Sequence, residues 1–139
     1  MKASKLVPVT AISVVLWLTY TVAFAQSYVY GAPVELEGVL ISSTADPAIT
    51  YDEKPHQFKA LNLRKPINVL CSQRETDCQP ELGITFLHLV LKEKQMTQFK
   101  KLKGKTAKLS GTLFHSHTGH HFTSVLLDVQ SISPKYYRA

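Results

Sequence analysis

The chain has 139 residues and a formal net charge of +6 with its histidines neutral. This length is typical of a single domain. The modest excess of basic residues permits an anionic partner without requiring one. The sequence lacks internal repeats and low-complexity tracts, and it contains no G-x-S-x-G, P-loop or H-E-x-x-H pattern. These features argue against both a multidomain protein and an enzyme.

The first 25 residues have the layout of a secretory signal peptide. Lys2 and Lys5 precede an uncharged stretch, residues 6–25, which closes with the small-x-small triplet Ala23-Phe24-Ala25. Cleavage after Ala25 leaves a domain over residues 26–139, located in the bacterial periplasm or secreted. An uncleaved anchor is the alternative, because the stretch approaches the roughly 20 apolar residues that span a bilayer. After cleavage we expect no membrane span.

Cys71 and Cys78 are the only cysteines in the sequence, and the segment SQRETD separates them. In an exported chain such a pair most simply forms a disulfide. The spacing is wider than the C-x₂₋₄-C of zinc sites, so thiolate metal ligation is the weaker alternative. With no C-x-x-C in the sequence, thiol redox catalysis has no support.

Runs of alternating apolar and polar residues predict strands. The first run contains Gly38, which indicates a bulge or a sharp bend, and the second reaches Pro66, which an extended edge tolerates. In chain order we expect strands over residues 34–41, 56–63 with a continuation to 71, 84–91, 105–115 and 121–132.

The spacing of apolar residues along the sequence changes between the third and fourth of these predicted strands. Met96, Phe99 and Leu102 recur at threes among lysines and glutamines, which predicts a short amphipathic helix that ends at Gly104. Five strands with a helix between the third and fourth is the chain order of an OB-fold. We therefore predict a mainly β protein, a small five-stranded OB-like barrel with one short helix; an open α+β sheet is the alternative.

Four of the six histidines lie in the segment HSHTGHH: His115, His117, His120 and His121. If Thr118 and Gly119 form the centre of a two-residue turn, His117 opposes His120 and His115 opposes Phe122. Because strand side chains alternate between faces, His115, His117 and His120 then share one face of the hairpin. His121 points to the other face unless the loop is longer.

Three imidazoles beside a vacant position match the ligand set of a zinc site, and imidazole also suits Cu²⁺ and Ni²⁺. We take the four clustered histidines as candidate metal ligands, although no carboxylate or thiolate lies nearby in sequence. Three other interpretations stay open: a hydrogen-bonded hairpin tip, a patch that becomes charged below about pH 6, and a contact surface for an anion or a protein. We expect His56 and His88, which lie in predicted strands, to be structural.

The segment GTLFHSHTGHHFTSVLL resembles a bacterial family of small exported proteins known as domain of unknown function 4431. Gly111 to His115 and His117 to His121 match the motif G-T-L-F-H-x-H-T-G-H-H of that family. The segment LRKPINVLC at residues 63–71 is also similar, whereas the second cysteine, Cys78, departs from the family. The resemblance implies a small exported domain and no particular activity.

Three functions remain as hypotheses. The first is a non-catalytic binding module of the cell envelope that takes up a divalent metal at the histidines. The second is a protein-interaction role with a periplasmic partner, such as an inhibitor or an immunity-type antagonist. The third is capture of an oligosaccharide or an anion on the barrel face. Nucleic acid is not an expected partner, because the sequence lacks the interleaved aromatic and basic residues of stacking platforms.

Overall fold

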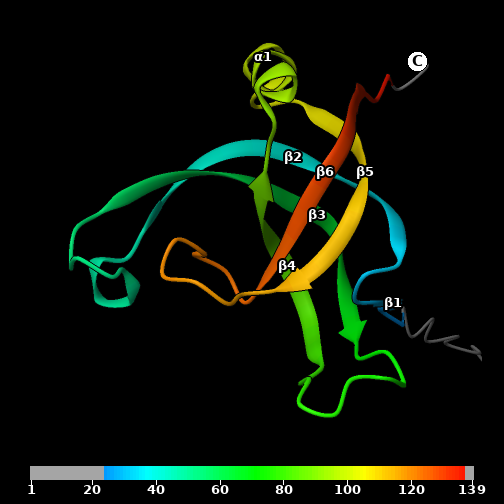
Figure 1. Ribbon diagram of the computed structural model, residues 1–139. Helices are drawn as coiled ribbons and strands as arrows, with labels where there is room; N and C mark the ends of the chain where they lie inside the picture. The colour runs from blue at the N-terminus through cyan, green and yellow to red at the C-terminus, as the bar shows by residue number, and fades with distance from the viewer. Residues whose placement is uncertain (1–23, 137–139) are drawn as a thin grey trace, which may run out of the picture.

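A computed structural model describes residues 24–136 of the chain (Figure 1). The predicted signal peptide, residues 1–25, lies almost wholly outside this range. The described residues form these elements in chain order: β1 (Gln26–Val29), β2 (Pro33–Ala45), the 3-10 helix η1 (Pro47–Ile49), β3 (His56–Leu70), β4 (Glu81–Val90), α1 (Glu93–Leu102), β5 (Thr106–His115) and β6 (Val125–Pro134). Within residues 24–136, no helix is long and apolar enough to cross a membrane.

Five of the six strands pair in a closed circuit. β2 is antiparallel to both β3 and β5, β3 is antiparallel to β4, and β5 is antiparallel to β6. The parallel pairing of β4 with β6 closes the circuit. β1 adds a parallel partner to the last residues of β3, from Ile67 to Leu70. The prediction of a mainly β chain with one helix is confirmed, and β1 is a strand that the sequence pattern did not predict.

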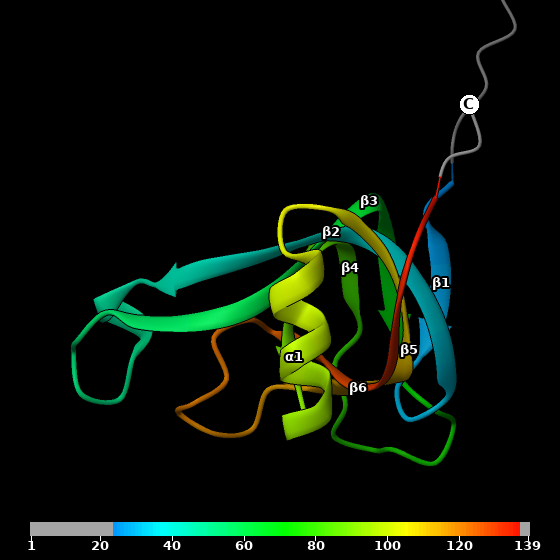
Figure 2. The same ribbon diagram turned by 90° about the horizontal axis from the view of Figure 1, so that it is seen from above.

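The hydrophobic core lies inside this circuit. Val34, Leu36 and Leu40 of β2 are buried, whereas the glutamates between them face outward, so the strand alternates as a half-buried strand must. Figure 2 shows α1 lying across one end of the curved sheet. Its Phe99 is buried in the same core, which anchors the helix there.

Gly38 is the residue at which β2 passes from one neighbouring strand to the other. It pairs with Leu63 of β3 and with Ala107 of β5. A Cβ atom at this position would lie 2.2 Å from the carbonyl oxygen of Asn62. Only glycine permits so close an approach of the two backbones. The predicted bend is therefore present, and β2 is visibly curved in Figure 2.

A buried glutamine joins α1 to the sheet. Gln95 donates from Nε2 to the carbonyl oxygens of Val129 and Gln130 at 2.7 and 3.0 Å, and its Oε1 accepts from the Lys92 N–H at 2.9 Å. The register between β5 and β6 shifts at Ser110 and leaves Gln130 without a ladder partner. The Gln95 amide satisfies the carbonyl that this irregularity frees.

The predicted tight turn at Thr118 and Gly119 is wrong. His115 pairs with Val125, and the whole segment 116–124 is a loop closed by the bond from Ser116 N–H to Ser124 O. Gly119 does not have the positive φ that a two-residue hairpin turn requires. Instead, its missing Cβ lets the chain approach Tyr51, to which a Cβ would lie 3.0 Å away. The loop folds back because Phe122 packs against a second cluster around Phe58 on the outer side of the sheet.

Candidate functional site

The loop 116–124, the start of β3 and the middle of β4 meet in a cluster of aromatic and imidazole rings. Phe122 stacks on His56 and on His88, with ring centroids 5.7 and 5.5 Å apart and interplanar angles of 15° and 8°. Tyr51 contacts His56 and also His120, the latter at 4.7 Å. His56 and His88 therefore support the loop, consistent with the structural role expected for them.

His88 and His121 hold the loop through ring nitrogens that accept hydrogen bonds. Nδ1 of His88 accepts from the Phe122 N–H at 3.3 Å, and Nδ1 of His121 accepts from the His117 N–H at 3.1 Å. A ring nitrogen that accepts cannot carry a proton, so both rings are neutral, with the proton on Nε2. Burial, followed by the neighbouring His121, lowers the pKa of His88 to about 4. Burial, followed by His117 and His120, also lowers the pKa of His121.

His115 and His117 have the opposite arrangement. Nδ1 of His115 lies 2.9 Å from the carbonyl oxygen of Ser116, and Nδ1 of His117 lies 3.3 Å from the carbonyl oxygen of His115. A carbonyl oxygen only accepts, so Nδ1 is the donor in both rings. In the neutral imidazole the lone pair is then on Nε2. Metal-binding histidines commonly donate their second ring N–H to a backbone carbonyl in this way.

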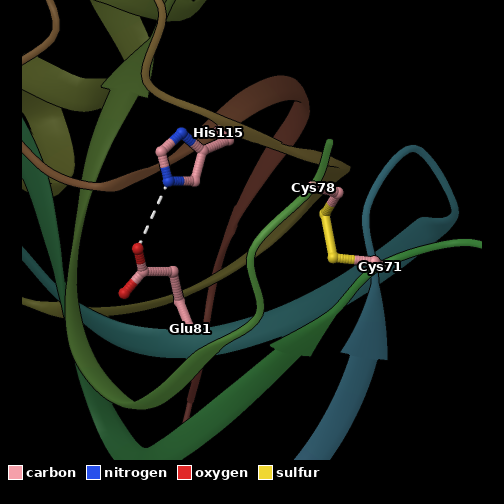
Figure 3. Close-up of a disulfide and its surroundings, with 4 residues drawn as sticks. All are labelled: Cys71, Cys78, Glu81 and His115. Atoms are coloured by element: carbon pink, nitrogen blue, oxygen red, sulfur yellow. Dashed lines mark hydrogen bonds and ion pairs between the residues drawn. A yellow bond between two sulfur atoms is a disulfide. The ribbon is translucent and has the colours of Figure 1, made fainter. Parts of the chain in front are cut away.

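A carboxylate from a distant strand faces one of these lone pairs. Nε2 of His115 lies 3.2 Å from Oε1 of Glu81, which is the first residue of β4. Figure 3 shows the two side chains pointing toward each other near the Cys71–Cys78 disulfide. A lone pair and a carboxylate oxygen at this separation repel unless a positive species lies between them. A proton on Nε2 satisfies the pair, and so does a metal cation.

A cleft of about 770 Å³ opens beside this pair. His115 and His117 line one wall, and the loop that the disulfide closes, residues 74–79, lines the other. Tyr30 also lines the cleft, and its hydroxyl is the one buried side-chain polar atom of residues 24–136 without a hydrogen-bond partner. Burial, together with Glu81 and Glu75, raises the pKa of Tyr30 to about 12, so the hydroxyl keeps its proton at neutral pH.

The four predicted ligands thus separate into three places. His115 and His117 line the cleft, His121 faces His117 and His88 from the loop, and His120 lies against Tyr51. The expectation that His115, His117 and His120 share one hairpin face is wrong, because it required the tight turn. Across residues 24–136, no group of three histidine, cysteine, aspartate or glutamate side chains is arranged to hold a metal ion.

Two residues of this site had no signal in the sequence pattern. Glu81 comes 34 positions before His115, and Tyr30 precedes β2, so only the closed circuit of strands brings Glu81 to His115 and Tyr30 to the cleft. The disulfide between Cys71 and Cys78 was predicted and is confirmed. It closes the loop that forms the wall opposite the histidines.

One known family matches the part of the chain that contains the histidine segment. Residues 86–133 match the family model of a domain of unknown function (DUF4431). The resemblance to DUF4431 noted in the sequence is confirmed over these residues. The DUF4431 match includes His88 and the four clustered histidines, whereas Glu81, Tyr30 and both cysteines lie before it. No curated protein and no solved structure matched the chain.

Proposed function

We propose that this chain is a non-catalytic binding module of the cell envelope that takes up a divalent transition-metal ion at Glu81, His115 and His117. The observation that carries the proposal is the 3.2 Å separation between Nε2 of His115 and Oε1 of Glu81. Two ligand atoms on a tetrahedral ion with bonds of about 2.0–2.1 Å lie roughly 3.3 Å apart. An ion between Glu81 and His115 therefore needs little movement of either side chain.

The hydrogen bonds of the histidines select the ligands. His115 and His117 each place the proton on Nδ1, and this leaves Nε2 for a metal. His121 accepts the His117 N–H at Nδ1 and so carries its proton on Nε2. To bind a metal through Nε2 it would have to give up that hydrogen bond. His120 packs against Tyr51, and we leave both residues out of the ligand set.

His117 completes the site by a rotation of its exposed side chain, which gives up the long 3.3 Å contact of its Nδ1 with the His115 carbonyl oxygen. It lines the same cleft as His115, and its ring contacts those of Phe114 and His121. Two imidazoles and one carboxylate leave a fourth position open to water or to another ligand, as in open zinc sites. Zn²⁺, Cu²⁺ and Ni²⁺ are the candidate ions, since imidazole suits all three.

We further propose that the closed circuit of β2 to β6 is an OB-like barrel, within a domain that begins at Gln26, just after the predicted signal cleavage. The order β2, β3, β4, helix, β5, β6 and the parallel pairing of β4 with β6 support this proposal. The disulfide is compatible with an oxidising compartment outside the cytoplasm. Export through the signal peptide, to the periplasm or beyond, belongs to the same proposal.

Calorimetric titration of the chain 26–139 with Zn²⁺, Cu²⁺ and Ni²⁺ at pH 7.5 tests the metal proposal. We expect one ion per chain, with binding that weakens as the pH falls because protons compete for the imidazole nitrogens. Glu81→Gln, which keeps the size of the side chain and removes its charge, should weaken binding by about tenfold or more, which corresponds to at least ~1.4 kcal/mol.

His120→Ala is the matched control, because it removes an imidazole of the same segment that the proposal leaves out of the site. It should bind the ion as tightly as the unchanged chain does. Equal losses for His120→Ala and Glu81→Gln, or no measurable binding of any of the three ions, would overturn the proposal. The contact between His115 and Glu81 would then be an ordinary ion pair with a protonated imidazole, and the loop would be left as a protein contact surface.

A further inference from the structure

We propose that the cleft between the disulfide loop and β5 is a binding site for an oligosaccharide, with the Tyr30 hydroxyl as a hydrogen-bond partner for the sugar. This inference is separate from the proposed metal function and does not require an ion. It rests on the volume of the cleft, the kinds of side chain that line it, and the unpartnered buried hydroxyl of Tyr30, which is one of the lining residues.

The Tyr30 hydroxyl is the feature that most needs a partner. The side chain is only 8% exposed, and its oxygen has less than 1 Å² of accessible surface and no hydrogen bond. A buried hydroxyl without a partner costs about 1–3 kcal/mol, so such groups in native proteins usually bond to water or to a ligand. The oxygen itself is not accessible, so a ligand hydroxyl reaches it only when the side chains that cover it move.

The walls of the cleft offer donors and acceptors of both kinds. Arg74 and Gln79 donate from the disulfide loop, while Glu75 and Asp77 accept from the same wall. Thr112 lies on the opposite side, in β5. Because this lining combines one basic and two acidic side chains with two histidines, the cleft does not select strongly for a cation or for an anion. Such a lining suits a neutral ligand with many hydroxyl groups.

Aromatic rings supply the apolar part of the site. Tyr30 is only 8% exposed, but Phe114, His115 and His117 line the cleft with rings that are not buried. The apolar face of a pyranose packs on such rings, while its hydroxyls bond to the polar walls. The volume of about 770 Å³ lies within the usual range for small-molecule sites, about 300–1,000 Å³. It is large enough for more than one sugar ring.

The test combines ligand titration with thermal unfolding of the metal-free chain 26–139, its disulfide intact. The probes are chitotetraose, cellotetraose and maltotetraose, which cover N-acetylated and plain hexoses with β and α linkages. We expect at least one of them to bind with micromolar to millimolar affinity. The amide signals of residues 74–79 and 112–117 should shift during the titration, and those at the far end of the sheet, near α1, should not.

Tyr30→Phe is the decisive variant, because it removes only the hydroxyl oxygen. With no ligand present, it should melt at the same or a higher temperature, since it removes an unsatisfied buried group. Its affinity for the bound probe should fall roughly 2- to 12-fold, the value of one neutral hydrogen bond. His120→Ala, whose ring lies against Tyr51 and outside the residues that line the cleft, should leave affinity for the probe within about twofold.

Three results would overturn the inference. The first is that none of the three tetrasaccharides binds at millimolar concentration. The second is that Tyr30→Phe binds the probe as well as the unchanged chain does. The third is that Tyr30→Phe is clearly destabilised without ligand, because the hydroxyl would then serve the fold through a bound water molecule. Failure of metal binding alone leaves the sugar-binding result unaffected, so the two proposals can be distinguished.

Discussion

Nε2 of His115 lies 3.2 Å from Oε1 of Glu81, although the two residues are 34 positions apart in the sequence. The contact joins the last residue of β5 to the first residue of β4. β4 and β5 do not pair directly. Around the circuit, β6 separates them in one direction, and β2 and β3 separate them in the other. The contact therefore depends on the closed arrangement of the strands, and it places a carboxylate beside the histidine segment.

The free energy of unfolding should decrease as the pH is lowered, because of His88. Its pKa is lowered from 6.5 to about 4 in the folded chain, so between these values only the unfolded chain binds the proton. Unfolding is then favoured as the pH falls from about 6.5 to about 4, and the loss levels off below that. Solvent screens a half-buried ring, so we expect a loss of about 1–2 kcal/mol, less than the full shift implies. Urea unfolding at several pH values measures it.

His88→Asn is the matched variant for this prediction. The amide oxygen of asparagine can still accept the Phe122 N–H, but the side chain does not titrate. Stability should then depend less on pH between 4 and 6.5 than in the unchanged chain. An unchanged slope in that window would show that another group carries the dependence.

Gln95→Ala should destabilise the fold by about 2–3 kcal/mol, because it removes three hydrogen bonds and leaves the carbonyl of Gln130 unpaired. Chemical denaturation measures the change. Thr97→Ala, on the exposed side of the same helix, is the control and should change stability by less than about 0.5 kcal/mol. Equal effects of the two substitutions would mean that Gln95 does not join α1 to β6.

Gly38→Ala tests the close passage of β2 across its neighbour. The added Cβ would lie 2.2 Å from the Asn62 carbonyl oxygen, a backbone atom that cannot move alone. We expect the free energy of unfolding to decrease by about 1–3 kcal/mol or more, as for other overpacked sites. Ser42→Ala, at an exposed position of the same strand, should be close to neutral. A stable Gly38→Ala variant with an unchanged spectrum would contradict the close contact.

Phe122→Ala should release the loop without unfolding the sheet. Phe122 is half-buried against His56 and His88, so its loss should cost about 1–2 kcal/mol, less than a fully buried phenylalanine. Amide hydrogen exchange in residues 116–124 should become faster, while exchange in β5 and β6 should change little. Uniformly faster exchange across the whole chain would show that the loop is part of the cooperative fold.

The sequence pattern was sufficient for most of the fold. Alternation located five strands, and Met96, Phe99 and Leu102 located the helix, because each element buries one regular face. β1 had no such signal, since it is short and its backbone pairing with Ile67–Leu70 holds it in place. The burial of Gln95 also had no signal, because a polar side chain is buried only where a free carbonyl requires it.

The candidate site was less predictable than the fold. The sequence singled out the histidine segment as a candidate site, but the geometry predicted for it depended on a turn that does not form. Phe122 finds its partners at His56 and His88, which lie more than thirty positions away, and so the loop folds back over the sheet. Glu81 reaches His115 through the same long-range closure. Neither relationship has a periodic signature in the sequence.

The proton positions on the six imidazoles offer the most direct test of the metal site. Two-bond ¹H–¹⁵N correlation spectra at pH 7.5 distinguish the ring nitrogen that carries a proton from the one that does not. We predict a protonated Nδ1 in His115 and His117 and a protonated Nε2 in His88 and His121, with Zn²⁺ shifting Nε2 of the first pair only. Shifts confined to His120 or His121 upon addition of Zn²⁺, or no shift in any ring, would contradict a metal site at Glu81, His115 and His117.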